Sequence, residues 1–239
     1  MGGSHHDWEG CFNIRDLGGL PTRGGRATAH SAFLRGDSVC RLTDRGRQAV
    51  REDGVRTIVD LRRASELQRD PNPFANVPEE IAFLHLPFSD DAIEARVRDI
   101  PTGAERYRVM LDDGRQRVAR IMTALATAER AVLFHCYVGR DRTGMVAAML
   151  LRLAGVPDEE IVRDYVLTDE RMAPLYEEWR TEMDDERRAR FDRAIAEEGA
   201  PIEAALRHLD DRYGGVEAYL LGGGVSADSI VALTEALVR

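Results

Sequence analysis

Short apolar runs alternate with helical stretches along the chain up to about residue 155. Runs rich in β-branched, aromatic and leucine residues predict strands at TIVDL (57–61), IAFLHLPF (81–88) and AVLFH (131–135). Helical spacing predicts helices over residues 42–55, with Thr43 as N-cap and Gly54 at the end, and over residues 104–129. This alternation is typical of an α/β fold in which a mostly parallel central sheet is flanked by helices.

The pattern changes after the last predicted strand. Residues 143–155 (TGMVAAMLLRLAG) are apolar on nearly every side, which predicts a helix buried in the middle of the fold. From residue 157 the chain is helical and heavily charged, with helix starts expected at Pro157 and Thr168 and a helix end at Gly214. The predicted fold therefore carries an extra C-terminal helical segment.

One part of that segment, EEWRTEMDDERRARFDRAIAEE (177–198), has a sparse apolar stripe amid mixed charges. One interpretation is a helix with a solvated face. The other is a movable helical lid over a binding site. We keep both, and place the helical insertion or lid at about residues 170–213.

The composition, with 44% hydrophobic and 31% charged residues among 239, indicates a single globular domain over residues 1–239. Residues 1–11 form an N-terminal extension, and its MGGSHH start is either native or a remnant of an expression tag. No apolar run is long enough to span a bilayer, and no signal peptide is recognisable, so we expect a cytoplasmic protein without stable membrane insertion. The net charge of −9 argues against nucleic acid as a partner.

The cysteines and the basic residues limit which kinds of site the chain can form. Cys11, Cys40 and Cys136 are widely spaced and form no CxxC pair. We therefore expect no disulfide framework, no metal site and no cofactor. All 33 basic residues are Arg, because the chain contains no Lys.

The segment from Cys136 to Arg142 follows a predicted strand and precedes a predicted helix. This order directs backbone N–H groups and the positive end of a helix at one point, where an anion binds. Cys136 lies at the edge of that nest, where positive potential favours a thiolate at neutral pH. Arg142 closes the loop and offers a planar fork to two oxygens of an oxyanion, a geometry that fits phosphate.

Several other interpretations of this loop are weaker. An ATP-binding loop requires GxxxxGK[ST], and the chain has no Lys. A buried inert cysteine does not require the Gly, the two Arg and the Thr-Gly that follow Cys136. A sulfur-transfer enzyme of the rhodanese kind also uses a loop cysteine, but does not require the sequence Arg-Thr-Gly.

Residues 135–144, HCYVGRDRTG, resemble the HCxxGxxR[ST]G signature of the cysteine-dependent phosphatases. More narrowly, they resemble the bacterial atypical tyrosine phosphatases whose loop reads HCxxGKDRTG. The segments FNIRDLGGL (12–20), FLRGDS (33–38), TIVDLRRASE (57–66), DYVLT (164–168) and GGVEAYL (214–220) are similar to the same group. The resemblance implies a phosphatase fold and hydrolysis of phosphate monoesters without metal.

The resemblance also implies roles for the loop residues. Cys136 would be the nucleophile that forms a phosphocysteine, and Arg142 the clamp on the phosphoryl oxygens, as the residues themselves suggest. Thr143 would donate its hydroxyl to the cysteine sulfur, and His135 would fix the loop through hydrogen bonds. The phosphate would be bound by the loop from residue 137 to 142, namely Tyr137, Val138, Gly139, Arg140, Asp141 and Arg142.

Arg140 departs from the narrower group, which usually has Lys there. The bias against Lys explains the change, but a guanidinium is planar and less compact than an ammonium. Arg140 would therefore fit a second phosphate differently from a Lys. Two basic residues in the loop are also typical of phosphoinositide phosphatases, although an anionic membrane would repel an acidic protein.

A leaving phenolate or alkoxide needs a proton, and the chain has no WPD sequence to supply it. We favour Asp90 as this general acid, because strand ends of a parallel sheet face the same crevice. Asp141, inside the loop, is the second candidate, and Asp91 the third. Asp90 and Asp91 also suit helix caps.

Two flanking motifs receive supporting roles. Arg15 and Asp16 are expected to form an ion pair or turn that pins the N-terminal segment. Asp60, Arg62 and Glu66 are expected to tie the sheet to the next helix, without a catalytic role.

The function predicted is a protein-tyrosine phosphatase acting on phosphotyrosine-containing proteins or peptides, with dual or triple specificity left open. A phosphoinositide phosphatase is the alternative within the same chemistry. A catalytically silent phosphate-binding module is the alternative from another class.

Overall fold

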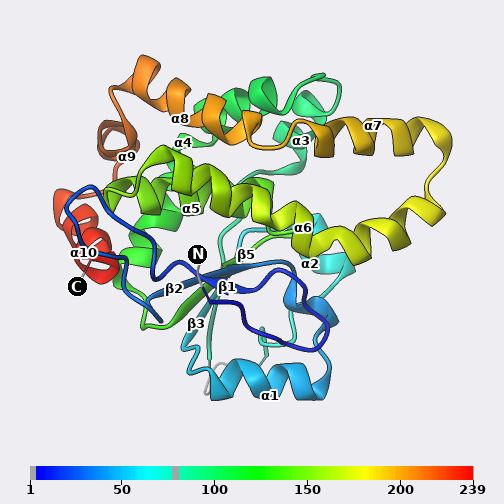
Figure 1. Ribbon diagram of the computed structural model, residues 1–239, viewed down its shortest axis with the longest axis horizontal. Coiled ribbons are helices and arrows are strands. Elements are labelled where there is room, and N and C mark those ends of the chain that lie inside the picture. Colours follow the sequence, from blue (N-terminus) through cyan, green and yellow to red (C-terminus); the bar gives the residue numbers. More distant parts are fainter. Residues whose placement is uncertain (1–3, 77–80, 239) are drawn as a thin grey trace.

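The computed structural model in Figure 1 describes residues 4–76 and 81–238. Within these residues, five strands form one sheet in the order β1-β2-β5-β3-β4. β1 pairs antiparallel with β2, and the other pairings are parallel, which confirms the predicted mostly parallel sheet. The strands are β1 (Arg15–Asp16), β2 (Phe33–Gly36), β3 (Thr57–Asp60), β4 (Ala82–His85) and β5 (Val132–His135).

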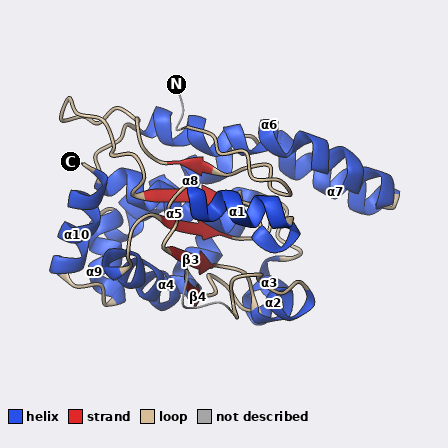
Figure 2. Cartoon of the chain, turned by 90° about the horizontal axis from the view of Figure 1, so that it is seen from below, coloured by secondary structure: helices blue, strands red, loops and turns tan. Residues whose placement is uncertain are grey.

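Helices cover both faces of the sheet. In Figures 1 and 2, α1 lies on one face, and α4 and α5 lie on the other. The 3-10 helix η1 (Val39–Arg41) follows β2. The α-helices are α1 (Asp44–Glu52), α2 (Ala64–Arg69), α3 (Asp91–Val97), α4 (Gly103–Thr127), α5 (Asp141–Leu153), α6 (Asp158–Glu182), α7 (Asp185–Ala196), α8 (Ala200–Tyr213), α9 (Val216–Gly223) and α10 (Ala227–Leu237).

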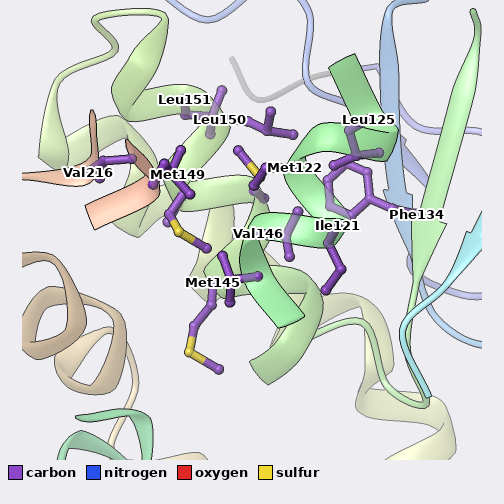
Figure 3. Packing of buried hydrophobic residues seen from close by; sticks show 14 of the residues in the cluster. Ile121, Met122, Leu125, Phe134, Met145, Val146, Met149, Leu150, Leu151 and Val216 are labelled. Atoms are coloured by element: carbon purple, nitrogen blue, oxygen red, sulfur yellow. The ribbon is translucent and has the colours of Figure 1, made fainter. Parts of the chain in front are cut away.

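Alternation along β5 divides the apolar interior into two cores. Val132 and Phe134 enter the main core with α4 and α5, whereas Leu133 enters a second core with α1. Figure 3 shows side chains of α5 interdigitating with those of α4 beside Phe134 of β5. β5 is thus buried on both faces, and the loop that follows it starts from a rigid base.

The structure confirms most of the predicted helix ends. α5 is buried on nearly every side, as its composition predicted. Thr43 caps α1, and Gly214 ends α8 in the left-handed conformation. The helix start expected at Thr168 is wrong: this residue lies inside α6, buried, and its hydroxyl accepts a hydrogen bond from Arg15 at 3.1 Å.

The segment from residue 170 to 213 divides into two parts. α8 buries Ile202, Leu206 and Leu209 in the main core. The second half of α6 and all of α7 form a hairpin that projects at one side of the molecule (Figures 1 and 2), and α7 has no buried residue. Among the described residues, no helix combines the length and apolar character needed to cross a membrane.

Candidate active site

The loop between β5 and α5 forms a nest around the sulfur of Cys136. Cys136 follows directly after β5 and is 2% exposed. Gly139 has φ of +78°, a conformation that glycine adopts without strain, and its N–H donates to the sulfur at 3.3 Å. The helix α5 begins two residues later, at Asp141. The expected strand, loop and helix therefore meet at this sulfur.

Arg142 is fixed by a carboxylate from a distant part of the chain. Its two terminal nitrogens donate to the two carboxylate oxygens of Glu66 in α2, at 2.5 and 2.9 Å. Burial opposes the charge of Arg142, but the hydrogen bonds to Glu66 and the nearby Cys136 outweigh burial and raise the pKa of Arg142. Sequence reasoning gave Glu66 only a structural tie to the sheet, and the observed contact assigns it to the site.

Asp141 lies at the first turn of α5 with 44% of its side chain exposed. Its carboxylate accepts a hydrogen bond from the hydroxyl of Tyr107 in α4, and that hydroxyl lies 2.7 Å from the hydroxyl of Tyr165 in α6. Burial and the charge of Asp141 raise the pKa of Tyr107 well above its usual value. Tyr107 therefore stays protonated and remains a donor to Asp141.

Arg140 makes its contacts with the helical segment. Its Nε donates to Asp169 of α6, and a terminal nitrogen donates to the carbonyl of Glu198 at 3.4 Å. Its guanidinium carbon lies 5.2 Å from the ring centre of Tyr165. With 4% of the residue exposed, the Arg140 side chain links the loop to α6 and to the turn before α8.

Thr143 and His135 are both buried, but their contacts differ. Nδ1 of His135 donates to the carbonyl of Cys136 at 3.1 Å, and its Nε2 accepts from Asn72 at 3.2 Å. These bonds agree with the expected supporting role. The Thr143 hydroxyl makes no hydrogen bond to any residue the structure describes, so the expected bond to the Cys136 sulfur is not formed here.

Asp90 lies outside this constellation. Its carboxylate caps α3 by accepting from the N–H of Ile93 at 2.9 Å, and it pairs with Arg117. The hydrogen bond from Ile93 lowers the pKa of Asp90, which opposes the protonated form that a general acid requires. The physical reason for its position is strand order: β3 lies between β4 and β5, so the strand before Asp90 is not the neighbour of the cysteine strand.

Asp91 is also outside the loop. It is an exposed carboxylate that accepts from Arg63 at 2.6 Å and from Ser65 at 2.8 Å. Asp90 and Asp91 line a pocket of about 300 Å³ that no residue of the cysteine loop lines, among the described residues. An acid role for either of them stays a prediction.

Arg15 and Asp16 do pin the N-terminal segment, but not by pairing with each other. Arg15 donates through Nε to Asp164 of α6 at 2.7 Å, fully buried. Asp16 accepts from the N–H of Gly18 at 2.9 Å and from that of Ser31 at 2.7 Å, which closes the turn. Asp164, in the DYVLT motif, carried no predicted role.

A pocket of about 320 Å³ opens beside the loop. Its polar wall includes Arg140, Asp141 and Arg142, and Arg98 and Arg106 add two further cations. Its apolar wall consists of Val97, Tyr107, Met110, Val138, Tyr176, Phe191, Ala194 and Ile195. Because the last three belong to α7, the projecting hairpin covers this pocket. Within the described ranges, no three His, Cys, Asp or Glu side chains are placed to hold a metal ion.

A mostly parallel sheet whose central strand ends in a cysteine nest closed by a fixed arginine is the architecture of the cysteine-dependent phosphatases. The chain belongs to the tyrosine phosphatase family, whose model matches residues 6–239, and it is a phosphatase. It is 33% identical to a tyrosine-protein phosphatase of Nostoc commune, over 87% of this chain and 75% of the relative. It is 28% identical to the triple specificity protein phosphatase PtpB of Mycobacterium tuberculosis, over 92% of this chain and 94% of the relative.

Proposed function

We propose that this phosphatase hydrolyses phosphotyrosine in proteins or peptides through a phosphocysteine intermediate. In the first step the Cys136 thiolate attacks phosphorus, the bond from phosphorus to the phenolic oxygen breaks, and the leaving oxygen takes a proton from Asp141. In the second step water attacks phosphorus, Asp141 takes a proton from that water, and the sulfur–phosphorus bond breaks to release phosphate and thiolate.

The observation that carries the proposal is the grouping of Asp141 and Arg142 on the wall of a pocket that also has an apolar, partly aromatic wall. Arg142 uses two of its five N–H donors on Glu66 and keeps three for phosphoryl oxygens. Tyr176 and Phe191 face the same pocket and suit an aromatic ring. A phosphotyrosine side chain matches both parts.

Asp141 is the general acid in this proposal, in place of Asp90. Asp141 belongs to the loop and lines the pocket with Arg142, whereas Asp90 lines another pocket. The Tyr107 hydroxyl supports Asp141 by fixing one carboxylate oxygen, which leaves the other oxygen for the leaving group.

The projecting hairpin acts as a lid in this proposal, within a single phosphatase domain. Phe191, Ala194 and Ile195 of α7 line the pocket that contains Arg142, so movement of the hairpin would change access to this pocket. Pro174 lies inside α6, where its missing N–H weakens the helix ladder. The helix before Pro174 is anchored through Asp164 and Thr168, and the part after it carries Trp179, which stacks on Tyr137 of the loop.

Phosphoinositides remain the alternative substrate class. They require a cation that is free to bind a second phosphate, and Arg140 already donates to Asp169 and Glu198. Arg98 and Arg106 make no ion pair with any described residue and leave positive charge at the pocket, which suits acidic residues of a phosphopeptide equally well.

The test is phosphate release in chelator by the wild type and by Cys136→Ser, with phosphotyrosine peptides, phosphoserine peptides and phosphoinositides. We expect release that depends on Cys136 and is fastest for phosphotyrosine. Faster turnover of phosphoinositides, with Arg140→Ala damaging that activity alone, would transfer the proposal to lipids. Binding of phosphopeptides without release by the wild type would instead support the silent module.

A further inference from the structure

Three successive carbonyl groups of the cysteine loop accept hydrogen bonds from outside the loop. The backbone N–H of Ser38 donates to the carbonyl of Tyr137 at 3.0 Å. Nδ2 of Asn13 donates to the carbonyl of Val138 at 3.2 Å, and a terminal nitrogen of Arg35 donates to that of Gly139 at 2.7 Å. Asn13 precedes β1, Arg35 lies within β2 and Ser38 follows β2. The two side-chain donors are more than a hundred residues from the loop in sequence.

The direction of these carbonyls decides the direction of the next amides. In a planar trans peptide, the C=O and the following N–H point to opposite sides. Carbonyls held on the outer side of the loop therefore turn the N–H groups of Val138, Gly139 and Arg140 to the inner side. The hydrogen bond from the Gly139 N–H to the Cys136 sulfur agrees with this geometry at the middle peptide.

The two side-chain donors are themselves held rigidly. Asn13 is fully buried, its N–H donates to Asp37 at 3.0 Å, and its Oδ1 accepts from Arg15. Arg35 is 1% exposed and pairs with Asp164, which holds its guanidinium in place. A Cβ at Gly139 would lie 2.8 Å from Nδ2 of Asn13, which shows how closely the loop packs on this donor.

We propose that Asn13 and Arg35 are positioning residues that hold the loop amides toward the phosphoryl group before substrate binds. This inference rests on the proposed function, since it assigns the amides to an oxyanion. Preorganised amides need no reorientation when charge develops at phosphorus, and misaligned ones lose that advantage. Neither residue touches the reacting atoms.

Two variants of Asn13 isolate the donor. Asn13→Asp has nearly the same shape and keeps the acceptor for Arg15, but replaces the donor with an oxygen that repels the Val138 carbonyl. Asn13→Leu removes the donor without adding a charge, and it also removes the acceptor for Arg15, which Asn13→Asp keeps. Thr28→Val is the matched control, because the buried Thr28 hydroxyl donates to the Leu17 carbonyl at 2.6 Å, outside the loop.

The measurement is protection of Cys136 from iodoacetamide by inorganic phosphate, alongside kcat and KM for nitrophenyl phosphate and thermal unfolding. We expect both Asn13 variants to need about tenfold more phosphate for half-protection. We also expect kcat to fall about 10- to 100-fold with a smaller change in KM, because the amides serve the transition state more than the ground state. Thr28→Val should protect and turn over like the wild type.

Wild-type protection in either Asn13 variant would overturn the inference. An effect in Asn13→Asp alone would also overturn it, because added charge would then explain the loss. So would an equal loss in Thr28→Val, which would indicate general destabilisation. If Asn13→Leu does not fold, Asn13→Ser replaces it, since a serine side chain is too short to reach the carbonyl. Alkylation requires no turnover, so the inference is tested even if the proposed hydrolysis fails.

Discussion

Glu66→Gln tests whether the buried carboxylate fixes Arg142 for catalysis. Burial favours the neutral form of Glu66, but the hydrogen bonds and charge of Arg142 outweigh burial and lower the pKa of Glu66 from 4.5 to about 2. That difference corresponds to about 3 kcal/mol of favourable interaction for the charged form. Glutamine keeps the length of the side chain and one acceptor, but removes the charge.

The expected result has a stability part and a catalytic part. Loss of about 3 kcal/mol lowers the unfolding midpoint of a chain of this size by about 6–12 °C. Once released from Glu66, the Arg142 guanidinium samples other orientations, and we expect kcat/KM for phosphotyrosine peptide to fall about 10- to 100-fold. Thermal unfolding and steady-state kinetics on the same samples measure both effects.

Asp158→Asn is the matched control. Asp158 also receives two hydrogen bonds from one guanidinium, that of Arg152, but lies at the start of α6 and lines no part of the pocket beside the loop, among the described residues. We expect it to lose some stability and to keep wild-type kcat/KM. If Glu66→Gln also kept wild-type kcat/KM, the contact with Arg142 would be structural only and the reasoning would be refuted.

The remaining predictions concern the acid and the response to pH. Asp141→Asn should slow alkyl phosphates far more than nitrophenyl phosphate, whose leaving group needs no proton; an equal small effect on both would exclude Asp141 as the acid. Tyr107→Phe removes the hydroxyl that holds one carboxylate oxygen of Asp141, so kcat for alkyl phosphates should fall more than kcat for nitrophenyl phosphate, and an equal effect on both would contradict this. The pKa of Glu66 is lowered in the folded state, so the stabilising contribution of Glu66 is complete above about pH 4.5 and is lost as the pH falls toward 2. Calorimetry should show this loss of stability in the wild type and not in Glu66→Gln.

The sequence predicted the parts of the fold that local patterns determine. The strands β3, β4 and β5 and the buried helix α5 follow from runs of apolar residues, and the caps of α1 and α8 follow from Thr43 and Gly214. The strands β1 and β2 were not predicted. The order of strands in a sheet cannot be predicted from local sequence patterns. The expectation that Asp90 lies near the loop required β4 to be close to β5 in the sheet. Consecutive strands in the chain, β4 and β5, are separated in the sheet by β3.

The loop itself was predictable because its chemistry lies within one short segment. The contacts that support the loop could not be predicted, because each of them joins residues far apart in the chain. Glu66 and Arg142 are separated by 76 positions, and Arg15 and Asp164 by 149. With 33 basic and 42 acidic side chains, sequence alone cannot assign these partners.

Burial explains why the flanking motifs gather behind the loop. A charge taken out of water needs a partner of opposite sign, and a buried backbone carbonyl needs a donor. Asp164 meets Arg15 and Arg35 together, and burial of Asp164 is outweighed by these two cations, which lower its pKa. Two arginines against one carboxylate leave one positive charge behind the loop. That charge lies behind a loop proposed to bind a phosphoryl group, so we expect these motifs to serve the loop electrostatically as well as through hydrogen bonds.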